Sequence, residues 1–61
     1  MKPKCKLIGE DGNIFNLCAI ASRALKEAGL RDKVMEMQNK VIKSKSYDEA
    51  LIVLGDYVEI E

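Results

Sequence analysis

The two ends of the chain carry its most constraining pattern, because apolar residues alternate there with charges of opposite sign. Segment 4–8 alternates basic and apolar residues, and segment 57–61 alternates acidic and apolar ones. Side chains on a strand point to opposite faces with a period of two residues. We therefore expect two strands that share an apolar face, formed by Cys5, Leu7, Val58 and Ile60, and a charged face, formed by Lys4, Lys6, Glu59 and Glu61. Opposite charges on neighbouring strands contribute about 0.2–1 kcal/mol per pair, which favours pairing of the termini.

A stripe of helical period follows a turn at 9–13. The stripe consists of Ile14, Leu17, Cys18, Ala21, Ala24, Leu25 and Ala28, and Phe15 and Ile20 widen it on either side. Asn13 is a suitable N-cap, and Gly29 followed by Leu30 is typical of a helix C-terminus. The pattern predicts a central helix over 14–28.

Two further helices are predicted in the second half of the chain. Val34, Met37 and Val41 define one face of a helix over 32–43, with Met35 and Ile42 flanking that face. Ser46 and Glu49 have the spacing of a capping box, which predicts a helix that starts at 47. The apolar run 50–54 also fits a buried strand, but the capping box favours a helix that ends near Gly55.

These elements predict an α+β fold in the order β-α-α-α-β. The terminal strands would form a two-stranded sheet packed on a helical core. Sixty-one residues suffice for one domain, 1–61. A chain of this length buries only about 60% of its unfolded surface, so partners or crosslinks often stabilise such domains.

Composition argues against catalysis and metal binding. The chain has two cysteines and no histidine, too few ligands for a zinc site and no imidazole base to activate a thiol. We therefore expect no enzyme, no metal and no cofactor, with Cys18 as an inert core residue. The lysines beside Cys5 would lower its pKa, making it the more reactive thiol.

The composition also bears on location. The first residues lack the apolar run of a secretory signal, and no segment reaches the roughly 20 apolar residues of a membrane span. These features predict a cytoplasmic protein with reduced thiols.

Two apolar residues do not fit the predicted third helix. Ile52 and Val53 lie outside its Leu51/Leu54 face and next to its polar side. Either this helix is more deeply buried than its pattern suggests, or the pair is an exposed apolar patch that contacts a protein partner. The partner would be an unknown protein or a second copy in a weak homodimer, because a two-stranded sheet also leaves its edges open.

An alternative is an accessory role in nucleic-acid binding. The ten basic and ten acidic residues balance, but all ten basic residues lie within 1–45. The cations of the second helix and the following turn are candidate phosphate contacts: Arg31, Lys33, Lys40, Lys43 and Lys45. The next helix carries Asp48, Glu49 and Asp56 and no cation, so it would be repelled by a phosphate backbone. This makes nucleic acid the less favoured partner.

Three stretches carry a resemblance that spans nearly the whole chain: residues 5–17, 47–51 and 57–60. With their sequences CKLIGEDGNIFNL, YDEAL and YVEI, they resemble a group of small uncharacterised proteins from genomes and mobile elements of low-GC Gram-positive bacteria. The resemblance implies a bacterial cytoplasmic setting and no particular chemistry. The sequence as a whole favours a small non-enzymatic module that acts through protein–protein contacts.

Overall fold

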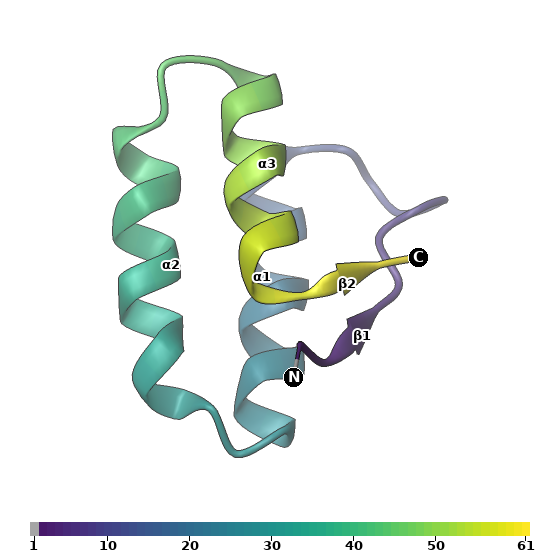
Figure 1. Ribbon diagram of the computed structural model, residues 1–61. Helices are drawn as coiled ribbons and strands as arrows, with labels where there is room; N and C mark the ends of the chain where they lie inside the picture. Colours follow the sequence, from purple (N-terminus) through teal and green to yellow (C-terminus); the bar gives the residue numbers. More distant parts are fainter. Residues whose placement is uncertain (1) are drawn as a thin grey trace.

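The computed structural model describes residues 2–61 and has the predicted α+β order. The elements are β1 (Lys4–Cys5), α1 (Ile14–Glu27), α2 (Arg31–Lys43), α3 (Tyr47–Tyr57) and β2 (Glu59–Ile60). The three helices form a bundle, and the strand pair lies beside α1 and α3, where both ends of the chain meet (Figure 1).

The two terminal strands pair in parallel, with Lys4 opposite Glu59 and Cys5 opposite Ile60. Parallel neighbours need a long crossover connection, which the helices provide. Backbone hydrogen bonds extend the contact beyond the strands: the Leu7 and Ile8 amides donate to the Glu61 carbonyl at 2.8 and 3.0 Å. This register places Lys4 opposite Glu59, as the alternation of charges predicts.

The structure corrects two details of this sheet. The predicted strand segments reduce to two residues each, and Tyr57 is the last residue of α3 rather than part of a strand. Cys5, Leu7 and Val58 are buried as predicted, but Ile60 is 37% exposed. Ile60 instead lines a shallow pocket at the edge of the sheet with Ile8.

Helix α1 begins and ends as its sequence predicts. The Asn13 side chain accepts a hydrogen bond from the Phe15 amide at 2.9 Å. At the other end Gly29 has a φ of 78°, and the Leu30 amide donates to the Leu25 carbonyl at 2.8 Å. This bond, together with one from Gly29 to Lys26, satisfies carbonyls of the last turn and reverses the chain toward α2.

Helix α3 is capped by the two residues of the predicted box, although Glu49 bonds the amide of the residue before the N-cap. The Ser46 hydroxyl accepts from the Glu49 amide at 3.1 Å, while the Glu49 carboxylate accepts from the Lys45 amide at 3.3 Å. Contrary to the prediction, Gly55 does not end the helix, which continues to Tyr57. A glycine inside a helix costs roughly 0.5–1 kcal/mol, and burial of Leu54 and Val58 on either side of it offsets that cost.

The core lies where the helices meet the sheet. Its largest fully buried side chains are Leu25, Met37, Leu54 and Val58, one from each helix and one from the segment that leads into β2. Val58 therefore joins the sheet to the helical core, which makes the C-terminal segment part of the packing.

Removal of residues 58–61 should unfold the protein, because the core loses Val58 and β1 loses its partner. Double substitution Glu59→Gln and Glu61→Gln is the control, since it keeps the backbone pairing and the buried valine. Amide dispersion in an NMR spectrum should collapse for the truncated chain and persist for the control. Native dispersion in the truncated chain would show that the helices fold without the sheet.

Candidate interaction surface

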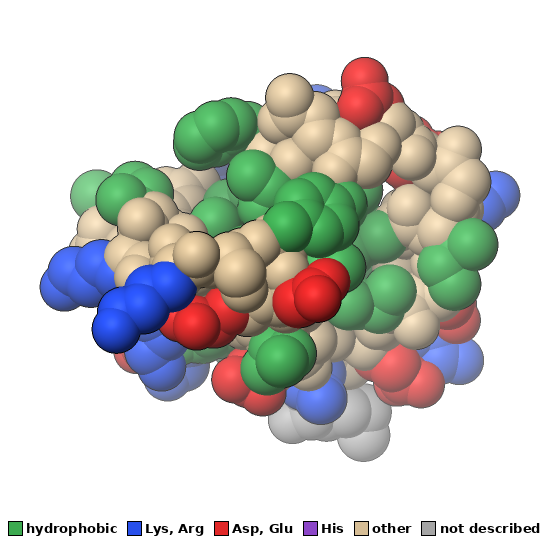
Figure 2. All heavy atoms as spheres, turned by 90° about the horizontal axis from the view of Figure 1, so that it is seen from above, with side chains coloured by type: hydrophobic (Ala, Val, Ile, Leu, Met, Phe, Trp, Pro, Cys, Tyr) green, Lys and Arg blue, Asp and Glu red, His purple; other side chains and the backbone are tan. Residues whose placement is uncertain are grey.

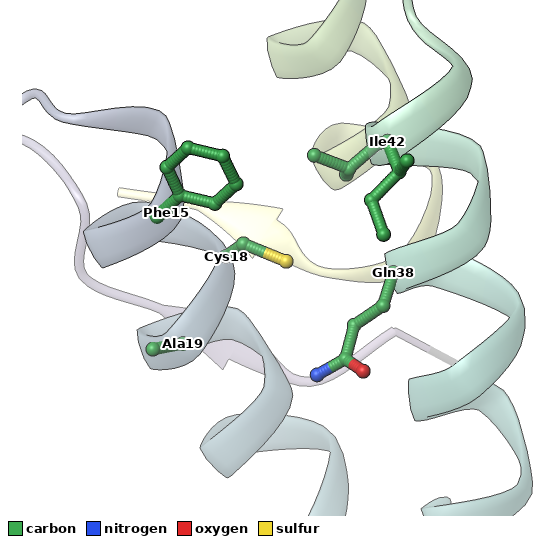
Figure 3. A pocket seen from close by; sticks show the side chains of 6 residues that line it. Phe15, Cys18, Ala19, Gln38 and Ile42 are labelled. Carbon is green, nitrogen blue, oxygen red and sulfur yellow. The ribbon is translucent and has the colours of Figure 1, made fainter.

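An apolar groove runs between α1 and α2. Its lining residues are Phe15, Cys18 and Ala19 on α1, and Gln38, Val41 and Ile42 on α2, and they enclose about 210 Å³. Figure 3 shows that Phe15 and Ile42 approach from opposite helices and that the Cys18 sulfur points between the helices toward α2. We call this feature the α1/α2 groove.

The rim of the groove carries large apolar side chains that the fold leaves exposed. Phe15 is 73% exposed and Ile42 is 72% exposed. The sequence placed Phe15 at the edge of the buried stripe and Ile42 beside the α2 core face, and both edge positions turn out to face solvent. Full burial of either side chain by a partner would contribute about 1.5–3 kcal/mol to the free energy of binding.

Polar groups inside the groove are satisfied within the chain. Ser22 is buried and its hydroxyl accepts a hydrogen bond from the Gln38 amide at 3.1 Å, which ties α1 to α2. Cys18 is buried, and its burial raises the pKa of the thiol. Burial also raises the pKa of Cys5, contrary to the lowering expected from its neighbouring lysines. Neither thiol is therefore activated as a nucleophile.

Exposed charged residues of both signs lie beyond the groove, toward the α1–α2 turn. Residues four apart on a helix share a face, so Lys26 continues the line of Ser22 and Arg31 precedes Met35 on the same line as Ile42. Arg23 follows Ala19 by the same spacing, but it lines a separate depression with Glu10 and Ile20. Glu27 and Asp32 are exposed next to Lys26 and Arg31 in the sequence. Apart from Gln38, the lining of the groove itself is apolar, and it includes no charged side chain.

The predicted interface pair divides between surface and core. Ile52 is 67% exposed, whereas Val53 is half-buried and packs against the core. Asp48 and Asp56 lie four residues before and after Ile52, so the three exposed side chains form one line along the outer face of α3. We call this line the α3 ridge.

The candidate nucleic-acid contacts are all exposed, but they do not form one uninterrupted basic face. Lys33 and Lys40 each lie 4.0 Å from the Glu36 carboxylate, and the Lys40 ammonium lies 5.4 Å from the centre of the Tyr57 ring. Arg31 is the first residue of α2 and is not part of this pair. Lys43 ends α2 and Lys45 follows it.

The groups around Glu36 shift the pKa values of two side chains on α2. The Tyr57 hydroxyl donates to Glu36, and this bond, reinforced by Lys33 and Lys40, lowers the pKa of the carboxyl. Tyr57 likewise raises the pKa of Lys40. The one carboxylate therefore offsets part of the charge of the two lysines, which reduces the field that Lys33 and Lys40 offer to a polyanion.

Apolar side chains are also exposed at one end of the bundle. Figure 2 looks onto the end that carries the α2–α3 connection, and it shows exposed hydrophobic side chains with basic and acidic groups among them. Tyr47 belongs to this end, where its hydroxyl donates to the Gly12 carbonyl.

Residues 2–61 contain no group of three or more potential metal-ligating His, Cys, Asp or Glu side chains. Within the same range, no helix has both the length and the apolar character needed to cross a membrane. No protein-family model, curated protein or solved structure matched the chain. The interpretation of the site therefore depends on its own geometry.

The carboxyl of Glu36 should titrate below the ordinary range for glutamate, and Tyr57→Phe should return its pKa toward that range. The substitution removes the hydroxyl that stabilises the charged form. Since the folded-state pKa is lowered, the contribution of Glu36 to stability is present at neutral pH and is lost as the pH falls through that pKa.

Carbon-detected NMR titration of the glutamate side chains measures this directly. Tyr47→Phe is the matched control, because Tyr47 bonds to a backbone carbonyl elsewhere. A Glu36 pKa that is unchanged by Tyr57→Phe would show that the hydrogen bond does not set it.

Proposed function

We propose that the protein is a small, non-enzymatic interaction module that binds a protein partner through the α1/α2 groove. The observation that carries the proposal is the position of Phe15 and Ile42, which are exposed on facing helices over an apolar cavity. Exposed apolar surface that is contiguous and rimmed by polar residues is typical of binding sites. The two free cysteines agree with a reducing compartment such as the cytoplasm.

The shape of the groove favours a helical partner. Two antiparallel helices with apolar residues along their junction present a linear depression, the kind of surface that accepts the apolar face of an amphipathic helix. A 61-residue protein offers a small contact area, which suits a weak and reversible complex. Phe15, as the one aromatic side chain on the rim, would be the energetic anchor.

Nucleic-acid binding is less well supported, because Lys33 and Lys40 are already paired with Glu36. The two functions differ in their response to salt. Binding to phosphates weakens steeply as salt rises, whereas an apolar contact does not.

If Phe15 belongs to a binding surface, its substitution should lower the folding stability much less than substitution of a buried residue of α1. Phe15→Ala should change the unfolding free energy by less than about 1 kcal/mol, because most of the side chain is already in water. Leu17→Ala, two residues away and buried, should cost about 2–5 kcal/mol. Urea denaturation of both variants measures the difference. A Phe15→Ala cost equal to that of Leu17→Ala would assign Phe15 to the core and remove the anchor.

Site-specific photocrosslinking tests the binding itself. A photoreactive side chain at position 42 should form discrete protein adducts in cells, and the same group at exposed position 43 should not, because Lys43 is the last residue of α2 and does not line the groove. Identical adduct patterns at the two positions, or none at either, would overturn the proposal. Adducts with nucleic acid alone would favour the alternative.

A further inference from the structure

Gln38 brings a polar group into the α1/α2 groove, whose other lining residues among 2–61 are apolar or cysteine. Its amide nitrogen donates to the Ser22 hydroxyl at 3.1 Å, and Figure 3 shows that nitrogen on the side of α1 and the oxygen turned away from it. Ser22 is buried in α1, so the bond holds the end of the Gln38 side chain in one orientation. It also decides which atoms of the amide remain for another molecule.

The remaining atoms of the Gln38 amide include its oxygen. A side-chain amide has one acceptor oxygen and two donor hydrogens, and the bond to Ser22 uses one hydrogen. Within residues 2–61, no buried side-chain oxygen or nitrogen lacks a hydrogen-bond partner. Since the bond to Ser22 involves the nitrogen, the half-buried Gln38 presents its oxygen to solvent at the groove.

A helix that covers the groove takes this oxygen out of water. A buried acceptor that finds no donor weakens a complex by about tenfold. A site with such a group rejects ligands that lack the matching polar atom more strongly than an apolar pocket rejects a ligand of the wrong size. The Gln38 oxygen therefore discriminates among helices that are otherwise equally apolar.

The groove is about one helical turn long. Phe15 and Ala19 are four residues apart on α1, as are Gln38 and Ile42 on α2. Each interval spans about 6 Å along its helix. Phe15 and Ile42 form the apolar end, and the Gln38 amide lies at the other end (Figure 3). A helix aligned with the groove places two side chains in it, three or four residues apart, because those positions share a face.

We infer that Gln38 selects the partner of the groove. The partner helix carries a large apolar side chain that lies between Phe15 and Ile42 and, one turn away, a hydrogen-bond donor that faces the Gln38 oxygen. The inference rests on the proposed function of the groove and names the chemistry of its ligand. A single polar contact in an apolar helix interface also fixes the register, because a shifted helix leaves both polar groups unpaired.

A phage-displayed library of helical peptides tests this specificity, with positions i, i+3, i+4 and i+7 of one face randomised. Peptides are selected on the native protein after those that also bind Ile42→Glu are removed. Selection should enrich a large apolar residue and, three or four positions away, a residue with a donor group. Selection on Gln38→Leu should enrich apolar residues at both positions.

Gln38→Glu gives an independent readout, because it keeps the shape of the side chain and makes the acceptor negative. Selection on this variant should enrich lysine or arginine at the donor position, since a charged acceptor prefers a charged donor. The test therefore does not depend on the stability of Gln38→Leu. Circular dichroism checks that each variant keeps the helical fold.

Affinities of the best selected peptide give the size of the effect. Replacement of its donor residue by leucine should weaken binding to the native protein about tenfold, and binding to Gln38→Leu by less than about twofold. Asn39→Leu is the matched control and should behave like the native protein. Asn39 is an exposed amide next to Gln38 and lies outside the groove lining.

The outcomes separate this inference from the proposed function. Selected peptides with a wholly apolar face, or a donor whose loss weakens binding to the native protein and to Gln38→Leu equally, would overturn the inference and leave the proposed function standing. A library in which no peptide prefers the native protein to Ile42→Glu would remove both. A native protein that sediments as a dimer, and as a monomer after Ile42→Glu, would show that a second copy covers the groove and would also overturn the inference.

Discussion

The backbone pairing of the two ends holds the structure together. The Glu61 amide donates to the Cys5 carbonyl, and the Glu61 carbonyl accepts from the amides of Leu7 and Ile8. These bonds position Val58 under the helices and Cys5 and Leu7 against α1 and α3. Because both strands are only two residues long, the sheet is too small to be stable alone and depends in turn on the helices that cover it.

This closure also explains why apolar side chains remain outside. Three short helices and a minimal sheet bury one compact cluster, and residues at the edges of the helices' apolar faces remain in water. Phe15 and Ile42 lie at two such edges, on either side of one seam. The groove is therefore a direct result of building a core from so few residues.

The sequence was most informative where local chemistry acts. The Asn13 and Ser46 caps, the Gly29 turn and the order of elements follow from side chains that bond to their own neighbours, and the alternation at the two ends correctly paired Lys4 with Glu59. The length of α3 was wrong because tertiary burial of Leu54 and Val58 outweighed the local cost of Gly55. Helix propensity describes local preferences only, so it does not include the contribution of tertiary burial.

The candidate surface was harder to predict for a related reason. Periodicity identifies which residues share a helix face, but it does not say where the neighbouring helix ends. Ile52 and Val53 are adjacent and equally apolar, yet one faces solvent and the other the core. Phe15 and Ile42 belong to different helices, so no pattern within one helix links them. The Glu36–Tyr57 bond likewise joins residues 21 positions apart.

The central claim is that the α1/α2 groove binds a partner helix, and the isoleucine methyl groups report on it most directly. Ile42 lines the groove, Ile52 forms the α3 ridge, and Ile8 and Ile60 mark the sheet edge. Methyl NMR spectra recorded as cell extract is added should show the Ile42 signal shifting or broadening while Ile8 and Ile60 stay fixed. Shifts confined to Ile8 and Ile60 would place the contact at the sheet edge and contradict the account.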